Sequence, residues 1–298
     1  MKRVDLKVWF ACNNHCEFCV QGDKRLQYKP RKIDEIYEIL SKEYKNGATG
    51  VVFTGWEPTV YKHLLEAIRF AKWAGYESIQ IQSNGRSFSD KSYVLSLIEA
   101  WVTEFSPSIH GFHKETHDKL VGSPWAWDEV IQWIRNLTSL HQIILINSVI
   151  TKANYKEIPL LAKLLITLWV KHFQFAYVHI LWSAEKNKES IPPRKSDIMP
   201  YVHKALDIAR ANQVSAFTEA IPYCFMWGYE YAISENVIPD TTVFDAEKRT
   251  DNYEEYRIFE GKAKHEKCRL CIKNDVCEWP WKEYPEIYGW DEFHAIAA

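Results

Sequence analysis

The chain has little glycine and no cysteine between Cys19 and Cys224. It holds 11 glycines and 13 tryptophans in 298 residues, whereas glycine ordinarily makes up about 7% of a protein. No apolar run reaches the ~18 residues that a membrane-spanning helix needs. The net charge of −2 gives no basic footprint for nucleic acid. The composition therefore predicts neither a membrane segment nor a nucleic-acid partner.

The first cysteines form a short run after the apolar stretch Val8–Phe10. Cys12, Cys16 and Cys19 are separated by three and then two residues. Three thiolates can hold three irons of a [4Fe–4S] cube and leave the fourth iron open, whereas ferredoxins use four cysteine ligands. The run therefore indicates chemistry at a cluster in addition to electron storage. A zinc loop or incidental thiols are the alternative.

The remaining cysteines gather near the other end of the chain. They are Cys224, Cys268, Cys271 and Cys277, the last three in a C-x2-C-x5-C pattern. Four thiolates complete a closed site for a second cluster or a zinc ion, and the spacing does not separate the two. Cys224 lies outside a compact motif, so its predicted role as the fourth ligand depends on the fold.

The redox compartment of these thiols is predicted from the clustering of the cysteines and from the N-terminal residues. Clustered cysteines without a signal peptide indicate metal ligation rather than disulfides. The first residues, Met1–Asp5, lead directly into a predicted strand. We therefore expect a reducing, cytoplasmic setting, which also suits oxygen-sensitive clusters.

Strand and helix patterns alternate along most of the chain, which indicates βαβ units and a parallel sheet. The predicted strands are 5–10, 50–54, 78–82, 104–109, 143–150 and 173–179, with a short one at 214–218. The predicted helices are 33–45, 61–73, 91–100, 127–140, 155–168 and 197–211. Six strands with right-handed crossovers predict an α/β fold, a partial (β/α)6 TIM-like barrel. We expect this domain over residues 1–213 and a loop-rich metal-cluster extension, dependent on its metal for folding, over 214–298.

Polar motifs follow the first three predicted strands. Cys12–Cys19 follows the first, the run Gly55-Trp56-Glu57-Pro58-Thr59 the second, and Ser83-Asn84-Gly85-Arg86 the third. Ligands in such folds bind at the carboxyl ends of the strands. Alone, an Asn-Gly pair indicates only a turn; its position here favours a ligand site.

These motifs resemble the radical S-adenosylmethionine (SAM) superfamily. The cysteine run resembles its cluster signature, down to Phe18 before the last cysteine. The second motif resembles its GGEP turn, and the third its Thr-Asn-Gly segment near SAM. Residues 108–118 and 147–154 resemble further stretches of SPASM/Twitch enzymes, and the late cysteines resemble their auxiliary [4Fe–4S] module. The SAM-binding positions that the resemblance implies are Phe18, Gly55, Trp56, Glu57, Pro58, Ser83, Asn84, Ser108 and Asn147.

The resemblance also implies an activity. A reduced cluster cleaves SAM to a 5′-deoxyadenosyl radical, which abstracts hydrogen from a substrate, while the second cluster accepts or relays an electron. No catalytic side chain is implied beyond the cluster and SAM. Glu219, Tyr223 and Glu230, near Cys224, face either substrate or, as we expect, solvent. A reductant such as flavodoxin or ferredoxin is implied as partner.

The substrate is open between a peptide, which we favour, and a small molecule or cofactor precursor. The first strand begins at about residue 4, which leaves no room for an N-terminal peptide-recognition domain, so a separate recognition protein is a possible partner. The alternative function is a two-cluster redox or scaffold protein without SAM chemistry. Such a carrier needs neither an open iron nor a GxEP turn.

Two further patterns depart from the resemblance. His110 stands where the family has aspartate, and with His113 and His117 it could form a third metal site; the resemblance instead makes His117-Asp118 a structural helix-start pair. Trp56, Trp125 and Trp182 stand where the family has glycine. One hypothesis is that UGA codons meaning glycine were read as tryptophan; the alternative is an aromatic-rich binding surface.

Overall fold

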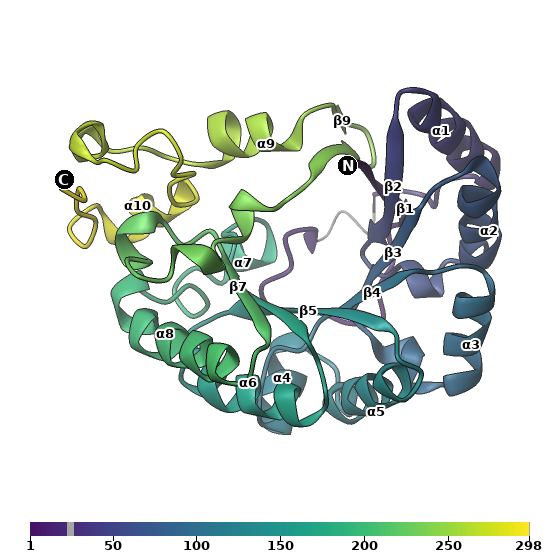
Figure 1. The fold of residues 1–298 in the computed structure, drawn as a ribbon, viewed down its shortest axis with the longest axis horizontal. Helices are drawn as coiled ribbons and strands as arrows, with labels where there is room; N and C mark the ends of the chain where they lie inside the picture. Colours follow the sequence, from purple (N-terminus) through teal and green to yellow (C-terminus); the bar gives the residue numbers. More distant parts are fainter. Residues whose placement is uncertain (23–26, 298) are drawn as a thin grey trace.

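A computed structural model describes residues 1–22 and 27–297. Its centre is one curved sheet with the strand order β7-β6-β5-β4-β3-β2-β1-β8-β9 (Figure 1). All neighbouring strands are parallel except β8 and β9. The strands are β1 Lys2–Trp9, β2 Ala48–Gly55, β3 Ser78–Ser83, β4 Glu104–Pro107, β5 Ile143–Ile150, β6 His172–Tyr177, β7 Ser215–Glu219, β8 Asp240–Phe244 and β9 Arg249–Thr250.

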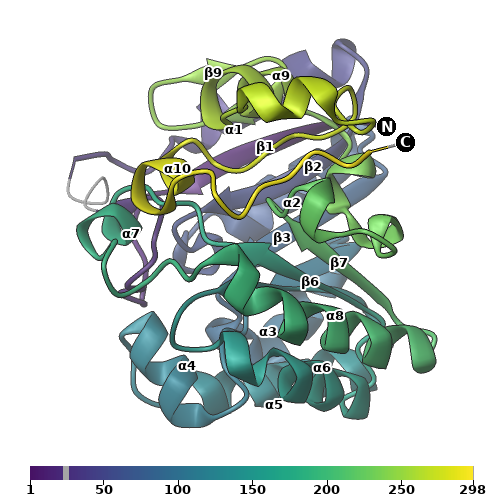
Figure 2. The ribbon, with the colours of Figure 1, turned by 90° about the vertical axis from the view of Figure 1, so that its left-hand side faces the viewer.

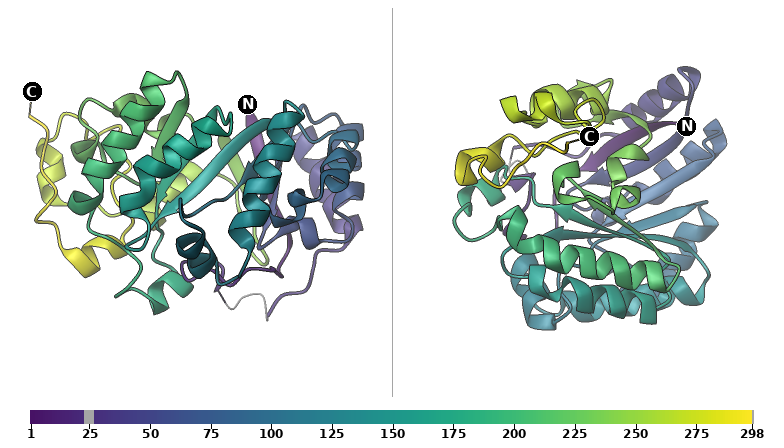
Figure 3. Two further views of the ribbon diagram at one scale, coloured as in Figure 1. Left: turned by 90° about the horizontal axis from the view of Figure 1, so that it is seen from below. Right: turned by 60° about the vertical axis from the view of Figure 1, so that its left-hand side comes forward.

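Helices cover the outer side of the curve, and Figure 3 shows α5, α6 and α8 from below. The helices are α1 Ile33–Lys45, α2 Leu64–Ala74, α3 Lys91–Glu99, α4 Lys114–Val121, α5 Ala126–Ser139, α6 Ile158–Thr167, α7 Ser183–Lys186, α8 Lys195–Ala211, α9 Tyr253–Tyr256 and α10 Glu283–Tyr288. The segment with α9 lies across the open side of the curve from α5 and α6 (Figures 1 and 2). α10 meets the start of α8, where the Lys195 N–H donates to the Tyr284 hydroxyl at 2.8 Å. None of the described helices is long and apolar enough to cross a membrane.

Apolar and polar side chains alternate along β1, so this strand separates the hydrophobic core from a polar cavity. Val4, Leu6 and Val8 are fully buried in the core beneath the helices. Arg3 and Asp5, on the opposite face, line an interior cavity. Successive side chains of a strand point to opposite faces, so one strand builds both the core and the wall of the site.

The predicted α/β fold and its open, partial barrel are confirmed, and every predicted strand is present. The sheet also continues into the C-terminal extension. β7 pairs with β6, and β8 pairs in parallel with β1, where Val4 opposes Thr242. The extension is therefore joined to the first strand, while the domain boundary at residue 213 stays a prediction.

Candidate functional site

A cavity of about 860 Å³ opens inside the sheet, and the three cysteines of the first run line it. Predicted residues from the cysteine loop, from the ends of β2, β3 and β4 and from within β5 share the lining: Phe18, Gly55, Trp56, Ser83, Asn84, Ser108 and Asn147. Glu57 and Pro58 are not part of the lining. The strand ends thus gather most of the predicted site at one place, as parallel packing requires.

The cysteine loop is held against the end of α4. The main-chain N–H groups of His15 and Glu17 donate to the carbonyls of Val121 and Leu120 at 2.8 and 3.0 Å. The loop's Phe18 is buried and contacts the ring of His110, with centroids 4.7 Å apart. These contacts fix the direction in which the loop presents its thiols.

Glu57 is fully buried and its carboxylate is occupied by the protein itself. One oxygen accepts from the N–H and hydroxyl of Thr59 at 2.9 and 2.6 Å and from the Ser83 hydroxyl at 2.7 Å. The other accepts from the Asn84 N–H at 2.7 Å. Glu57 therefore orders the turn after β3, and its place in the SAM site stays a prediction.

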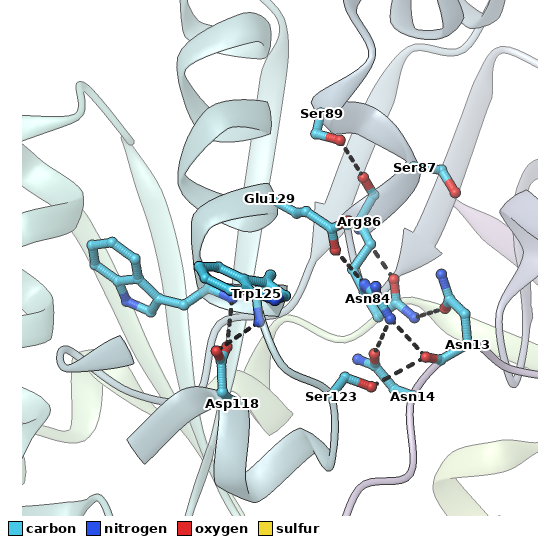
Figure 4. A network of polar contacts seen from close by, with 12 residues as sticks. Asn13, Asn14, Asn84, Arg86, Ser87, Ser89, Asp118, Ser123, Trp125 and Glu129 are labelled. Carbon is cyan, nitrogen blue, oxygen red and sulfur yellow. Dashed lines mark hydrogen bonds and ion pairs between the residues drawn. The ribbon is translucent and has the colours of Figure 1, made fainter. Parts of the chain in front are cut away.

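The turn after β3 also holds the cysteine loop in place (Figure 4). The Asn84 amide donates to Asn13 Oδ1 at 2.6 Å and to Cys12 Sγ at 3.6 Å. The Arg86 guanidinium donates to the Asn13 carbonyl at 2.7 Å and to Asn14 Oδ1 at 3.1 Å, and pairs with Glu129 of α5. Asn13, Asn14 and Glu129 were not predicted, because their partners lie far away in the sequence.

Two of the three histidines, His110 and His117, accept main-chain hydrogen bonds. Main-chain N–H groups of Val149 and His110 donate to Nδ1 of His110 and His117, at 3.1 and 3.0 Å. Asp118 accepts the N–H groups of Trp125 and Trp127 at 2.8 Å each, at the start of α5 (Figure 4). The structural interpretation of His117-Asp118 is confirmed in this respect.

The residues present fit a cluster and SAM. Burial is the main cause that raises the pKa of the Cys12 thiol to about 11, so a charged thiolate there requires a bound cation such as iron. Two buried atoms of the cavity wall, Asn147 Oδ1 and His117 Nε2, have no hydrogen-bond partner within the described part of the chain. Such groups are costly unless a ligand satisfies them.

A second, smaller pocket brings the late cysteines together. Cys224, Cys268, Cys271 and Cys277 all line it. Main-chain N–H groups of Ile296 and Trp279 donate to the sulfurs of Cys271 and Cys277, each at 3.4 Å. Burial, with smaller contributions from Cys277 and Cys268, raises the pKa of Cys224 to about 12. Cys224 therefore lies with the three cysteines from which the sequence separates it.

Glu219 was expected to face solvent, and the structure corrects this. It ends β7, lines the large cavity, and accepts from the Gln174 amide at 2.6 Å. Burial and the neighbouring Glu235 raise its pKa. Tyr223 is buried and donates to Asn236 at 3.0 Å. Glu230 belongs to neither pocket lining. The hydrophobic periodicity of the sequence did not indicate that Glu219 lines the cavity.

Several known proteins are similar to this chain in sequence. A probable GTP 3′,8-cyclase of Saccharolobus islandicus is 30% identical over 180 residues, 59% of this chain and 57% of its own length. The GTP 3′,8-cyclase of Aquifex aeolicus is 31% identical over 169 residues, 55% of this chain and 52% of its own length. The match thus spans little more than half of these relatives.

Two solved structures have the same fold. Native anSMEcpe with bound AdoMet superposes with a TM-score of 0.71 at 17% identity, over 100% of this chain and 93% of that one. Streptococcus suis SuiB bound to S-adenosylmethionine gives 0.69 at 17% identity, over 93% and 72%. The model of the Radical SAM superfamily matches residues 6–165, more than half of the sequence. The chain belongs to the radical SAM superfamily.

Proposed function

We propose that this chain is a radical SAM enzyme with two [4Fe–4S] clusters that oxidises a peptide. The observation that carries the proposal is the shared cavity, because the three thiols of the Cys12–Cys19 loop and the strand-end residues line one space of about 860 Å³. When bound, the cluster and SAM supply a 5′-deoxyadenosyl radical that removes a hydrogen atom from the substrate.

The protein's part at the first site is to hold and orient. Cys12, Cys16 and Cys19 would ligate three irons. The main-chain N–H of Asn14 and the Asn84 amide donate toward Cys12 Sγ at 3.3 and 3.6 Å, and donors of this kind tune the potential of a cluster. Asn147 Oδ1 and His117 Nε2, both without a partner among the described residues, would receive polar groups of SAM.

The second site would hold an auxiliary cluster. Its four thiols share one pocket, which supports full ligation. Around a single zinc ion with bonds of about 2.3 Å, sulfurs lie about 3.8 Å apart; in a cube each thiolate binds its own iron and the sulfurs lie farther apart. Among the described residues no group of three or more potential ligands stands out as a preformed single-ion site. A zinc ion stays the alternative occupant of this pocket.

Glu219 would complete a two-electron oxidation. Once a hydrogen atom has left the substrate carbon, the Glu219 carboxylate would take one proton, and the four late cysteines would hold a cluster able to accept one electron. Glu219 lies in the cavity wall, held by Gln174 at 2.6 Å. It stands five residues before Cys224, so the proton and electron acceptors come from one short segment. The substrate thereby loses two electrons and two protons in all.

A peptide suits the cavity better than a nucleoside triphosphate. The charged side chains of its described lining are Arg3, Lys7, Asp5, Glu104 and Glu219. Lys7 is paired with Asp245 at 2.6 Å, and a triphosphate needs several cationic donors. The GTP cyclase relatives keep a nucleotide as the second candidate. SuiB has been solved with its precursor peptide SuiA, with a TM-score of 0.66 to this chain.

Anaerobic reconstitution tests the proposal. The chain with iron, sulfide, SAM and dithionite should release 5′-deoxyadenosine, and Cys16→Ala should release none while keeping the auxiliary iron. Absence of 5′-deoxyadenosine from a fully reconstituted chain would instead support the two-cluster redox protein. Flavodoxin or ferredoxin should replace dithionite as reductant, and a separate recognition protein should lower the KM for a peptide.

A further inference from the structure

Five tryptophans adopt a backbone conformation that bulky L-residues avoid. Their φ angles are 79° at Trp101, 68° at Trp125, 64° at Trp169, 51° at Trp182 and 59° at Trp279. A β-carbon in this left-handed region crowds the following carbonyl oxygen, so the conformation is unfavourable for L-residues. Asparagine and aspartate are the residues, after glycine, that usually accept it. Among the described residues, none of either type has a positive φ, and the only other non-glycine residues with one are His141, Gln213 and Ala220.

Two of the five end helices in the manner of glycine. The N–H of Trp101 donates to the carbonyl three residues earlier at 2.9 Å, and the following N–H donates five residues back at 3.1 Å. Trp169 repeats the pattern at 2.9 and 3.0 Å. Gly75 does the same after α2, at 3.1 and 3.1 Å. This paired bond needs a left-handed residue at the position after the helix, usually glycine.

The side chains make only exposed contacts at these ends: the ammonium of Lys72 lies 4.3 Å from the centre of the Trp101 ring, and that of Lys171 lies 5.8 Å from the centre of the Trp169 ring. Trp101 is 58% exposed and Trp169 is 74% exposed. Trp133 shows what a required tryptophan looks like here. It is fully buried, meets Phe88 edge-on at 5.8 Å, and fills space beside Gly85 that a β-carbon would occupy.

We infer that the native protein carries glycine at positions 101, 125, 169, 182 and 279, because its source reads UGA as glycine. A single codon then explains the shortage of glycine, the excess of tryptophan and the left-handed backbone together. Positions 125 and 182 were suspected from motif alone, and their φ angles are independent support. Position 56 joins the group by motif only, since its φ is not positive.

The inference changes the site. Trp56 lines the large cavity, and the N–H of Ser183, next to Trp182, donates to the Cys19 carbonyl at 3.1 Å. Glycine at 56 removes an indole from the cavity wall, and glycine at 182 lets the main chain beside the cysteine loop approach a ligand closely. The effect on the cavity rests on the proposed function, whereas the inference that UGA encodes glycine does not.

Sequencing the gene at the tryptophan codons is the first test. We expect UGA at 101, 125, 169, 182 and 279, and UGG at 133, the matched control. UGG at the five positions overturns the inference. Mass spectrometry of the protein isolated from its source should show glycine in the same five peptides.

Purified variants supply a second readout. Relative to the printed sequence, Trp101→Gly and Trp169→Gly should each raise the melting temperature by roughly 2–4 °C. Trp133→Gly should lower it by more than that. A lowered melting temperature in both exposed variants contradicts the inference.

Binding of SAM separates the inference from the proposed function. Equilibrium dialysis of the reconstituted Trp56→Gly/Trp182→Gly chain should give tighter SAM binding than the printed sequence, with equal iron content. Equal affinity of the two chains overturns this effect on the cavity. If neither chain binds SAM, the proposed function fails, whatever the codons show.

Discussion

The main-chain N–H of Asn84 donates to the carboxylate of Glu57 at 2.7 Å, within the turn that holds Cys12. Glu57 in this way controls the first cluster from a position outside the cavity. We expect Glu57→Gln to weaken SAM binding roughly tenfold to hundredfold. The glutamine NH₂ group replaces one of the two carboxylate oxygens that accept the four hydrogen bonds, and hydrogen bonds to charged groups contribute about 1.5–3 kcal/mol. Anaerobic equilibrium dialysis measures this. The exposed Glu99→Gln is the control, and unchanged affinity in Glu57→Gln would sink the ordering role.

Arg86 should be needed for the first cluster alone. Its guanidinium bridges Glu129 and the Asn13–Asn14 segment, and lysine cannot reproduce that fork. We expect Arg86→Lys to lose iron from the first site during gel filtration while the auxiliary iron stays. Arg135→Lys, exposed on α5, should keep both. Equal loss from both sites would mean general misfolding rather than a specific anchor.

Asp118 should matter for stability rather than chemistry. It accepts two main-chain N–H groups at the start of α5. Asp118→Ala should therefore lower the free energy of unfolding by about 1–2 kcal/mol, measured by urea denaturation. Asp197→Ala, at an exposed position in the first turn of α8, should cost less. A change smaller than in this control would contradict the capping role.

Removing Cys224 tests the closed auxiliary site. The reconstituted chain should hold roughly eight irons, four per cluster, and Cys224→Ala should lose the auxiliary share. Release of 5′-deoxyadenosine should partly survive, and proteases should cut the 224–293 segment faster. A variant that retains all its iron would mean that one auxiliary iron is open to another ligand.

Proton acceptance by Glu219 predicts a pH dependence. Burial first, then Glu235, raises its pKa, while Lys262 and Arg257 oppose the shift. Because only the carboxylate accepts a proton, the rate should fall as pH drops through this raised pKa. Glu235→Gln removes a neighbouring negative charge, lowers the pKa of Glu219, and should move the acidic limb to lower pH.

Replacing Glu219 itself measures how much the proton acceptor contributes to the rate of product formation. Glu219→Gln should slow product formation by roughly 10²–10⁴-fold, while uncoupled 5′-deoxyadenosine release continues. Glu230→Gln is the control from the same segment, since Glu230 lines neither pocket. If the acidic limb stays unmoved in both Glu219→Gln and Glu235→Gln, another group accepts the proton.

Local patterns predicted the elements well. Helix α1 occupies Ile33–Lys45 as predicted, and the strand predicted at 5–10 overlaps β1, Lys2–Trp9. The strand-end rule indicated Asn84 and the family resemblance indicated Asn147, and both line one cavity. These features depend on neighbours a few residues away, which a sequence displays directly.

Contacts between residues far apart in the chain could not be predicted from the sequence. The acceptor role of Glu57 toward Asn84 depends on a residue 27 positions later, and the burial of Glu219 depends on the packing of a segment with little period. Parallel pairing of β8 with β1 joins residues 238 apart in the Lys2–Asp240 pair, and no local pattern encodes such a contact. The left-handed tryptophans likewise became visible only with the backbone.

The pairing of β1 with β8 also sets an order of events during synthesis. The first strand leaves the ribosome early, yet one of its two edges has no partner until Phe244 has been made. An open edge is a template for pairing with another chain. Nascent chains that stall before β8 are therefore exposed to aggregation, and completion of the last quarter of the chain protects its beginning.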